Sequence, residues 1–190
     1  ANKRIETRFN QSVKAIAHQE KKVLLNDEEL IYDKLIMATG SRPLIPPVEG
    51  SNLPGNFVLK SVSDLDRIVQ HRPAQVVVVG SGNIGVEVAE ALEIQGCDVT
   101  LIEMLERVMP RFLAPKPATM LRMLLEEHNI KVLTGEKVLK VEGENWVEGV
   151  ITDKRSLACD TLIWAVGVKQ NIELAQDAGI EIGSWGGIKV

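Results

Sequence analysis

The chain has 190 residues, of which 45% are hydrophobic, 25% charged and 4% aromatic, and its formal net charge is -4. This balance predicts one or two folded domains. A net negative charge with few aromatic rings argues against a nucleic-acid partner, which needs a basic face and rings that stack on bases. No apolar run of about 18 residues is present and the first residues lack the apolar stretch of a signal peptide, so we expect a cytoplasmic protein without a membrane partner.

The cysteines and histidines show no spacing that is typical of a metal or redox centre. Cys97 and Cys159 lie far apart in the sequence, and the three histidines are scattered. We therefore predict two ordinary buried thiols and no metal site.

The first 74 residues are expected to form a small β segment and a crossover. Strands are predicted over 13–17 and 21–25, and the apolar run 35–38 is expected to continue as a buried strand. Residues 41–57 contain four prolines, which interrupt helices and strand ladders, so we place a domain boundary there. Ser63-Asp64-Leu65-Asp66 then predicts a short helix that opens with a capping box and ends before Pro73.

A β-α-β-α-β pattern begins at Gln75. Four valines predict a buried strand, and after a glycine-rich turn we expect a helix over 84–95 that Gly96 ends, a strand over 98–103, a helix over 115–128 and a strand over 130–134. Apolar strands alternating with helices predict an α/β fold, a Rossmann-like parallel sheet with helices on its faces. Further strands are predicted over 137–141, 146–151 and 161–165, and the first two should form an antiparallel meander through the turn 143–145.

The turn between the valine strand and the next helix has the spacing G-x-G-x-x-G and predicts a dinucleotide site. Gly80 permits the tight turn, Gly82 lets a pyrophosphate reach the backbone, and Gly85 lets helix and strand pack closely. The amides that open the helix, at Asn83 and Ile84, face such an anion. A turn that binds nothing is the alternative.

Glu103 ends the next strand, 18 positions beyond Gly85, where a carboxylate accepts hydrogen bonds from the adenosine ribose hydroxyls. A 2′-phosphate about 4 Å from this carboxylate would meet a repulsion of order 1 kcal/mol per charge pair in water. NAD(H) is therefore expected to be preferred over NADP(H). Two alternatives stay open: Glu103 is a solvated strand end, or Arg107 or Arg111 reaches a phosphate.

Four stretches carry a resemblance to a known family: YDKLIMATGSRPLIPPVEG (32–50), VVVVGSGNIGVEVAEAL (76–92), RVMPRFL (107–113) and CDTLIWAVGVKQN (159–171). They resemble the pyridine nucleotide-disulfide oxidoreductases, in the branch of NADH oxidases, coenzyme A-disulfide reductases and the rubredoxin, ferredoxin and nitrite reductase flavoproteins. The resemblance implies FAD contacts at Ala38, Thr39 and Gly40. For NAD it implies contacts at Val166, Gly167 and the helical Glu87 beside the nicotinamide, and it implies no other catalytic residue in this chain.

The same resemblance implies an enzyme that transfers a hydride from NADH to FAD and passes the electrons to oxygen, a disulfide or a redox protein. The expected organisation is 1–45 as the trailing strands of an FAD-binding domain, 46–74 as a crossover with a short helix, and 75–190 as the NAD(H)-binding domain. We expect the chain to be the middle of a longer homodimeric flavoprotein and to be inactive alone. Asn171 is also a candidate cap of a helix over 172–178. The alternative function is a non-catalytic module that senses nucleotide or docks to a subunit through the edges of residues 1–40.

Overall fold

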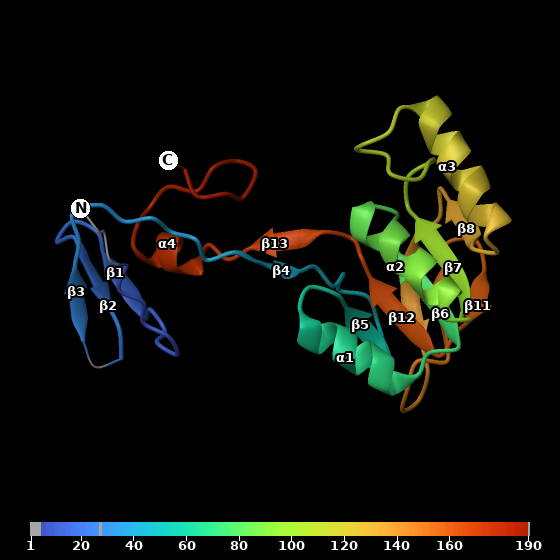
Figure 1. Cartoon of the computed structure of the whole chain (residues 1–190), viewed down its shortest axis with the longest axis horizontal. Helices are drawn as coiled ribbons and strands as arrows, with labels where there is room; N and C mark the ends of the chain where they lie inside the picture. Colours follow the sequence, from blue (N-terminus) through green and yellow to red (C-terminus); the bar gives the residue numbers. More distant parts are fainter. Residues whose placement is uncertain (1–4, 27, 190) are drawn as a thin grey trace. The chain divides into compact units, whose positions relative to one another are not determined.

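The structure is a computed structural model that describes residues 5–26 and 28–189. Its contacts divide the chain into two units (Figure 1). The larger unit is Pro43–Lys169, and the smaller unit combines the segment up to Arg42 with the segment from Gln170 onward. Residues 170–189 therefore cluster with the N-terminal segment, whereas the sequence-based organisation grouped them with 75–169.

A five-stranded parallel sheet forms the centre of the larger unit. Its order is β5-β12-β6-β7-β8, made of Asn56–Val58, Thr161–Trp164, Gln75–Val79, Asp98–Glu103 and Lys131–Thr134. The helices are α1 (Val62–His71), α2 (Asn83–Ile94) and α3 (Pro115–Glu127). The predicted elements between 75 and 134 are thus confirmed to within one or two residues, whereas β5 was not predicted.

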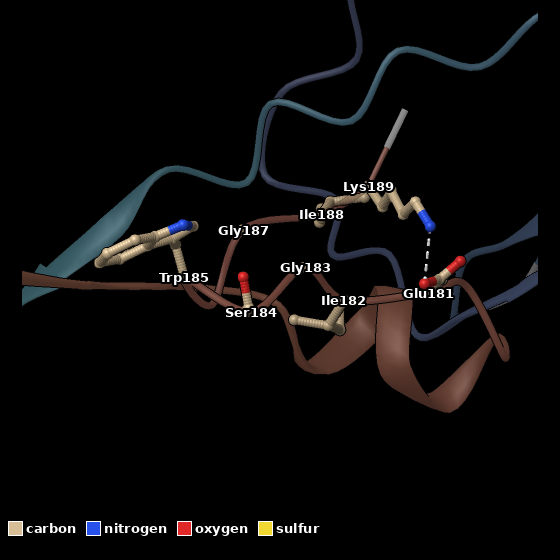
Figure 2. Close-up of a pocket in the computed structure, with 8 residues that line it drawn as sticks. All are labelled: Glu181, Ile182, Gly183, Ser184, Trp185, Gly187, Ile188 and Lys189. Carbon is tan, nitrogen blue, oxygen red and sulfur yellow. Dashed lines mark hydrogen bonds and ion pairs between the residues drawn. The ribbon is translucent and has the colours of Figure 1, made fainter.

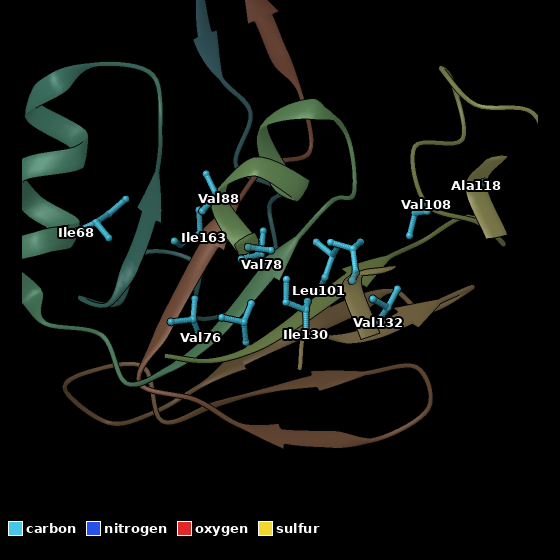
Figure 3. Close-up of a cluster of buried hydrophobic side chains, with 13 residues drawn as sticks. Ile68, Val76, Val78, Val88, Leu101, Val108, Ala118, Ile130, Val132 and Ile163 are labelled. Carbon is cyan, nitrogen blue, oxygen red and sulfur yellow. The ribbon is translucent and has the colours of Figure 1, made fainter. Parts of the chain in front are cut away.

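Alternate residues of the central strand β6 face two different layers. Val76 and Val78 pack in a buried cluster with residues of α1, α2 and α3 (Figure 3). Val77 and Val79 pack in a second cluster with an antiparallel meander, which has the order β11-β10-β9. The meander strands are β9 (Val138–Glu142), β10 (Gly149–Thr152) and β11 (Ser156–Ala158). The α/β class with a parallel sheet and a meander is confirmed, with the helices on one face and the meander on the other.

The cap of α1 lies two residues before its predicted position. Ser61 is the N-cap, and the Asp64 carboxylate accepts from the backbone amides of Ser61 and Lys60 at 2.9 and 3.1 Å. Both Ser61 and Ser63 are followed three residues later by an aspartate. The prediction of Ser63 and Asp66 was wrong because Asp64 is the buried carboxylate, whereas Asp66 is exposed.

The smaller unit contains a three-stranded antiparallel sheet of β1 (Ala15–Ala17), β2 (Lys22–Leu24) and β3 (Glu29–Ile31). The strands predicted over 13–17 and 21–25 are present but shorter. The predicted strand over 35–38 is wrong, because these residues pair with no strand in the described chain and Ile36 is exposed. Two further short strands, β4 (Ser41–Pro43) and β13 (Val168–Gln170), pair with each other, and the helix α4 covers Glu173–Asp177.

Asn171 does not cap α4, so that prediction was wrong. The N-cap is Ile172, which makes no side-chain cap. Instead the Asn171 side chain donates to the Thr39 carbonyl at 3.0 Å and accepts from Arg42 at 2.9 Å. These partners are distant from Asn171 in the sequence, so local capping preferences could not predict them.

Candidate functional site

The glycine turn connects the carboxyl end of β6 to the start of α2, and its outer glycines are required by close backbone approach. Gly80 has a φ of +100°, and a Cβ there would lie 2.6 Å from the Ala165 carbonyl oxygen. A Cβ at Gly85 would lie 1.8 Å from the carbonyl oxygen of Gly80. Position 80 therefore needs the left-handed backbone that glycine adopts freely, and position 85 needs a bare α-carbon so that α2 can pack on the strand.

Gly82 is different, because it borders open space. A Cβ at this residue would meet no atom within 4 Å among the described residues. Gly82 is the N-cap of α2, and neither a side-chain cap nor an acidic residue occupies the first turn of the helix. Asn83 and Ile84 are exposed beside it. The first amides of α2 therefore donate to no capping side chain, and an anionic group such as a pyrophosphate fits here.

Glu103 is held directly against this turn. Its side chain is buried with 9% of the residue exposed, and one carboxylate oxygen, Oε2, accepts from the Ser81 amide at 3.0 Å and the Ser81 hydroxyl at 2.7 Å. The other oxygen, Oε1, accepts from the Leu105 amide at 2.9 Å. The structure thus brings the predicted ribose acid and the glycine turn together, and Glu103 is not a freely solvated strand end.

Ser81 is a residue of this site that the sequence analysis missed. It is fully buried, and its carbonyl and hydroxyl oxygens accept from the Met109 amide at 3.0 and 3.2 Å. Met109 has a φ of +45°, which is unusual for a residue other than glycine. The available signal was a hydroxyl-bearing residue between the first two glycines of the turn.

Arg107 stabilises the loop after β7. Its guanidinium donates to the carbonyl oxygens of Pro110 at 3.1 Å and Leu113 at 3.3 Å. The sequence analysis considered Arg107 and Arg111 as phosphate ligands. Arg107 instead bonds to carbonyl oxygens of its own loop, while Arg111 is exposed.

The remaining predicted NAD contacts follow β12, next to the glycine turn. Val79 at the end of β6 pairs with Trp164 at the end of β12, so residues 165–167 emerge beside Gly80. Gly167 has a φ of +114°, and a Cβ there would meet nothing within 4 Å in the described chain. Val166 is half-buried, and Glu87 is exposed one turn into α2. The order of the sheet reverses between β6 and β12, and ligands of open α/β sheets bind at such points.

The predicted FAD segment, Ala38-Thr39-Gly40, lies in the smaller unit and has no regular secondary structure. The Thr39 hydroxyl donates to the Asn171 carbonyl at 2.6 Å, and the Asn171 amide donates to the Gly40 carbonyl at 3.0 Å. Gly40 has a φ of +69°, and a Cβ there would meet no described atom within 4 Å. The segment is thus fixed from one side and open at Gly40, which leaves room for a bound group.

The structure also contains a pocket of about 490 Å³. The pocket lies within residues 181–189 of the smaller unit, where Lys189 pairs with Glu181 at 2.8 Å and Trp185 is exposed (Figure 2). None of the predicted site residues lines it.

Among residues 5–26 and 28–189, no three His, Cys, Asp or Glu side chains gather as a metal site. No helix in the same ranges is long and apolar enough to cross a bilayer.

The parallel sheet, its glycine turn and the acid at the end of the next strand define a Rossmann-like α/β domain. The family model described as "Pyridine nucleotide-disulphide oxidoreductase" matches residues 1–190, and the chain belongs to that family. An NADH oxidase of Methanocaldococcus jannaschii is 41% identical over 164 residues, which are 84% of this chain and 37% of the relative. This chain therefore spans little more than a third of that relative.

Solved structures agree with this family. A NAD-dependent persulfide reductase from A. fulgidus is 34% identical with a TM-score of 0.88, over 93% of this chain and 34% of the other. A water-forming NADH oxidase from Lactobacillus brevis, bound to NADH, is 27% identical with a TM-score of 0.84, over 92% of this chain and 40% of the other. An engineered mutant of that oxidase, bound to NADPH, is 26% identical with the same TM-score and coverage.

Proposed function

We propose that the chain binds NADH at the glycine turn and, within a longer flavoprotein, holds the nicotinamide for hydride transfer to FAD. The observation that carries the proposal is the open backbone at Gly82 with the Glu103 carboxylate fastened beside it. NADH supplies the hydride and FAD accepts it. The residues of this chain bind the dinucleotide, orient it and exclude water from it.

Each residue at the switch point has a separate part in this proposal. The first amides of α2, including those of Asn83 and Ile84, bind the pyrophosphate, because they have no side-chain cap. Glu103 accepts from the adenosine ribose. Val166 and Gly167 border the nicotinamide side, where the absence of a side chain at Gly167 permits close approach. The exposed Glu87, in the second turn of α2, contacts the nicotinamide region.

A preference for NADH over NADPH is part of the proposal. In the NADPH-bound mutant of the Lactobacillus brevis oxidase, five residues are replaced: a glycine, an aspartate 18 positions later, the two residues after the aspartate, and a proline seven positions after it. Gly85, Glu103, Met104, Leu105 and Pro110 have the same spacing in this chain. By this spacing Glu103 corresponds to the aspartate that the NADPH-bound mutant lacks, so this chain has an acid at that position. A carboxylate at this position repels a 2′-phosphate.

The smaller unit supports the proposal that the chain works within a larger flavoprotein. Ile5, Phe9, Ile31 and Ile36 are each at least 80% exposed in this unit. So many large exposed apolar side chains in one small unit favour a surface that further chain covers. We propose that residues 38–40 contact FAD and that 170–190 return to the same flavin-binding part, since Asn171 holds Thr39 and Gly40. The final electron acceptor is oxygen, a disulfide or a redox protein.

Calorimetric titration of the 190-residue chain tests the proposal. We expect binding of NADH at least about tenfold tighter than binding of NADPH, because of the charge of Glu103. We also expect no oxidation of NADH by the chain without flavin. Equal affinities for the two dinucleotides, or no binding of either, would discard the assignment.

A further inference from the structure

We infer that Ser81 is a positioning residue, which sets the direction of the Glu103 carboxylate and thereby the selectivity for a ribose without a 2′-phosphate. The inference rests on the proposed function, because it needs Glu103 to face the ribose. Ser81 touches the acid through both its amide and its hydroxyl, and the residue is fully buried in the described structure.

The hydrogen bonds leave little acceptor capacity on Glu103. Each carboxylate oxygen has two lone pairs, and both Ser81 donors use Oε2. The Leu105 amide uses one lone pair of Oε1. The remaining acceptor site is on Oε1, and it is this oxygen that is left for a ribose hydroxyl. The Ser81 hydroxyl therefore determines which carboxylate oxygen serves the nucleotide.

The loop after β7 keeps part of its support when the hydroxyl is removed. The Met109 amide donates to the Ser81 carbonyl at 3.0 Å as well as to the hydroxyl at 3.2 Å. A Ser81→Ala variant thus retains the bond from Met109 to the backbone and the bond from the Ser81 amide to Glu103. It loses the 2.7 Å bond from the hydroxyl, so the carboxylate is held only by the Ser81 amide on Oε2 and the Leu105 amide on Oε1, and a second acceptor site opens on Oε2.

A less firmly held carboxylate affects the two dinucleotides differently. The ribose of NADH then meets a less precisely oriented acceptor, and a hydrogen bond to a charged group of this kind changes affinity by roughly tenfold. NADPH does not depend on that bond, and the negative charge that repels its phosphate stays in place. The Kd for NADH should rise by roughly five- to tenfold while the Kd for NADPH changes by less than about twofold.

A double-mutant cycle on the 190-residue chain tests the inference. The four proteins are the native chain, Ser81→Ala, Glu103→Ala and the double variant, each titrated with NADH and with NADPH. If Ser81 acts through the carboxylate, Ser81→Ala weakens NADH binding in the native background and changes it by less than about twofold in the Glu103→Ala background. Ser81→Cys, which keeps the size of the side chain and loses the strong donor, should repeat the result if Ser81→Ala does not fold.

The outcomes separate this inference from the proposed function. An equal loss of NADH and NADPH affinity, or the same loss in both backgrounds, would mean that Ser81 only supports the fold and would overturn the inference. A Glu103→Ala effect on the ratio of the two affinities with none from Ser81→Ala or Ser81→Cys would overturn the inference alone. An unchanged ratio in Glu103→Ala would overturn the ribose assignment and the inference together.

Discussion

The α-carbon of Gly85 faces the carbonyl oxygen of Gly80 so closely that a Cβ on Gly85 would lie 1.8 Å from this oxygen. The obstacle is a backbone atom at the end of β6, so α2 itself must move to admit a methyl group. Gly82, three residues earlier in the same turn, would place its Cβ in open space and has a φ of -71°, which any residue adopts. Two glycines of one motif therefore differ physically, since Gly85 is needed for packing and Gly82 borders open space.

Alanine substitutions should distinguish the two glycines. Gly85→Ala should lower the free energy of unfolding by about 1–3 kcal/mol, the usual cost of overpacking. Gly82→Ala should change it by less than about 0.5 kcal/mol, as at other open surface sites. The Gly82 variant should instead lose at least about tenfold in NADH affinity, because its Cβ occupies the space proposed for the pyrophosphate. Urea unfolding and calorimetric titration measure the two effects, and a Gly82→Ala chain that binds NADH normally would place the phosphates elsewhere.

Reversing the charge at Glu103 should shift the preference between dinucleotides. Glu103→Arg should weaken NADH binding and strengthen NADPH binding, so that the ratio of the two Kd values moves by at least about tenfold, since an arginine pairs with a phosphate. Glu127→Arg is the matched control, because it makes the same change of charge at an exposed position near the end of α3. Titration of both variants with both dinucleotides gives the result. The same ratio in the two variants would show that Glu103 does not face the ribose.

The position of the α1 cap gives a prediction that is independent of the ligand. Ser61→Ala should lower the free energy of unfolding by about 1 kcal/mol, because it removes the side-chain half of the capping box. Ser63→Ala should change the free energy of unfolding by no more than a few tenths of a kcal/mol, although the sequence pattern favoured Ser63 as the cap. Chemical unfolding of the pair measures the difference, and a larger loss in the Ser63 variant would restore the sequence-based assignment.

The same cap contributes a pH-dependent part of the stability. Hydrogen bonding from the Ser61 side chain, aided by Arg67 and the backbone amides of Ser61 and Lys60, lowers the pKa of Asp64 from 3.8 to about 2. A lowered pKa in the folded state means that the contribution is fully present above 3.8 and is lost as the pH falls towards 2. Asp64→Asn should therefore be less stable than the native chain at pH 7. The difference in stability between the two proteins should narrow as the pH falls from 3.8 towards 2. Thermal unfolding at several pH values would show this.

The two cysteines should react slowly with alkylating reagents in the folded chain. Burial raises the pKa of the Cys159 thiol to about 12, and it also raises the pKa of Cys97, whose thiol donates to the Pro73 carbonyl. The thiolate is the reactive form, so neither side chain is a good nucleophile at pH 8. Mass spectrometry after iodoacetamide treatment should show slow labelling of both, with Cys159 slower, and rapid labelling in urea. Fast labelling of folded Cys159 would contradict this picture.

Patterns that are local in sequence were sufficient for the main features of the larger unit. The valine run of β6, the glycine spacing and Gly96 at the end of α2 specify a strand, a turn and a helix within about twenty residues. Their predicted bounds agree with the structure. Glu103 was predicted as an acid of this site from its place at a strand end 18 positions beyond Gly85, and the register of the parallel strands places the end of β7 beside the end of β6. These features depend on side-chain period and backbone dihedral preference, both of which a short segment contains.

Only the tertiary structure decided which of several equivalent local patterns is used. Ser61 and Ser63 offer the same capping pattern, and burial of Asp64 selects the first. The three residues of β5 form a strand because they pair with β12, more than a hundred residues later in the chain. The contact of Ser81 with Glu103 likewise joins the turn after β6 to the end of β7, 22 residues later. The sequence by itself determined the glycine turn and the α/β class through local backbone preferences. The tertiary structure alone decided how Ser81 of that turn bonds to Glu103, because these hydrogen bonds form only when the two strands pack side by side.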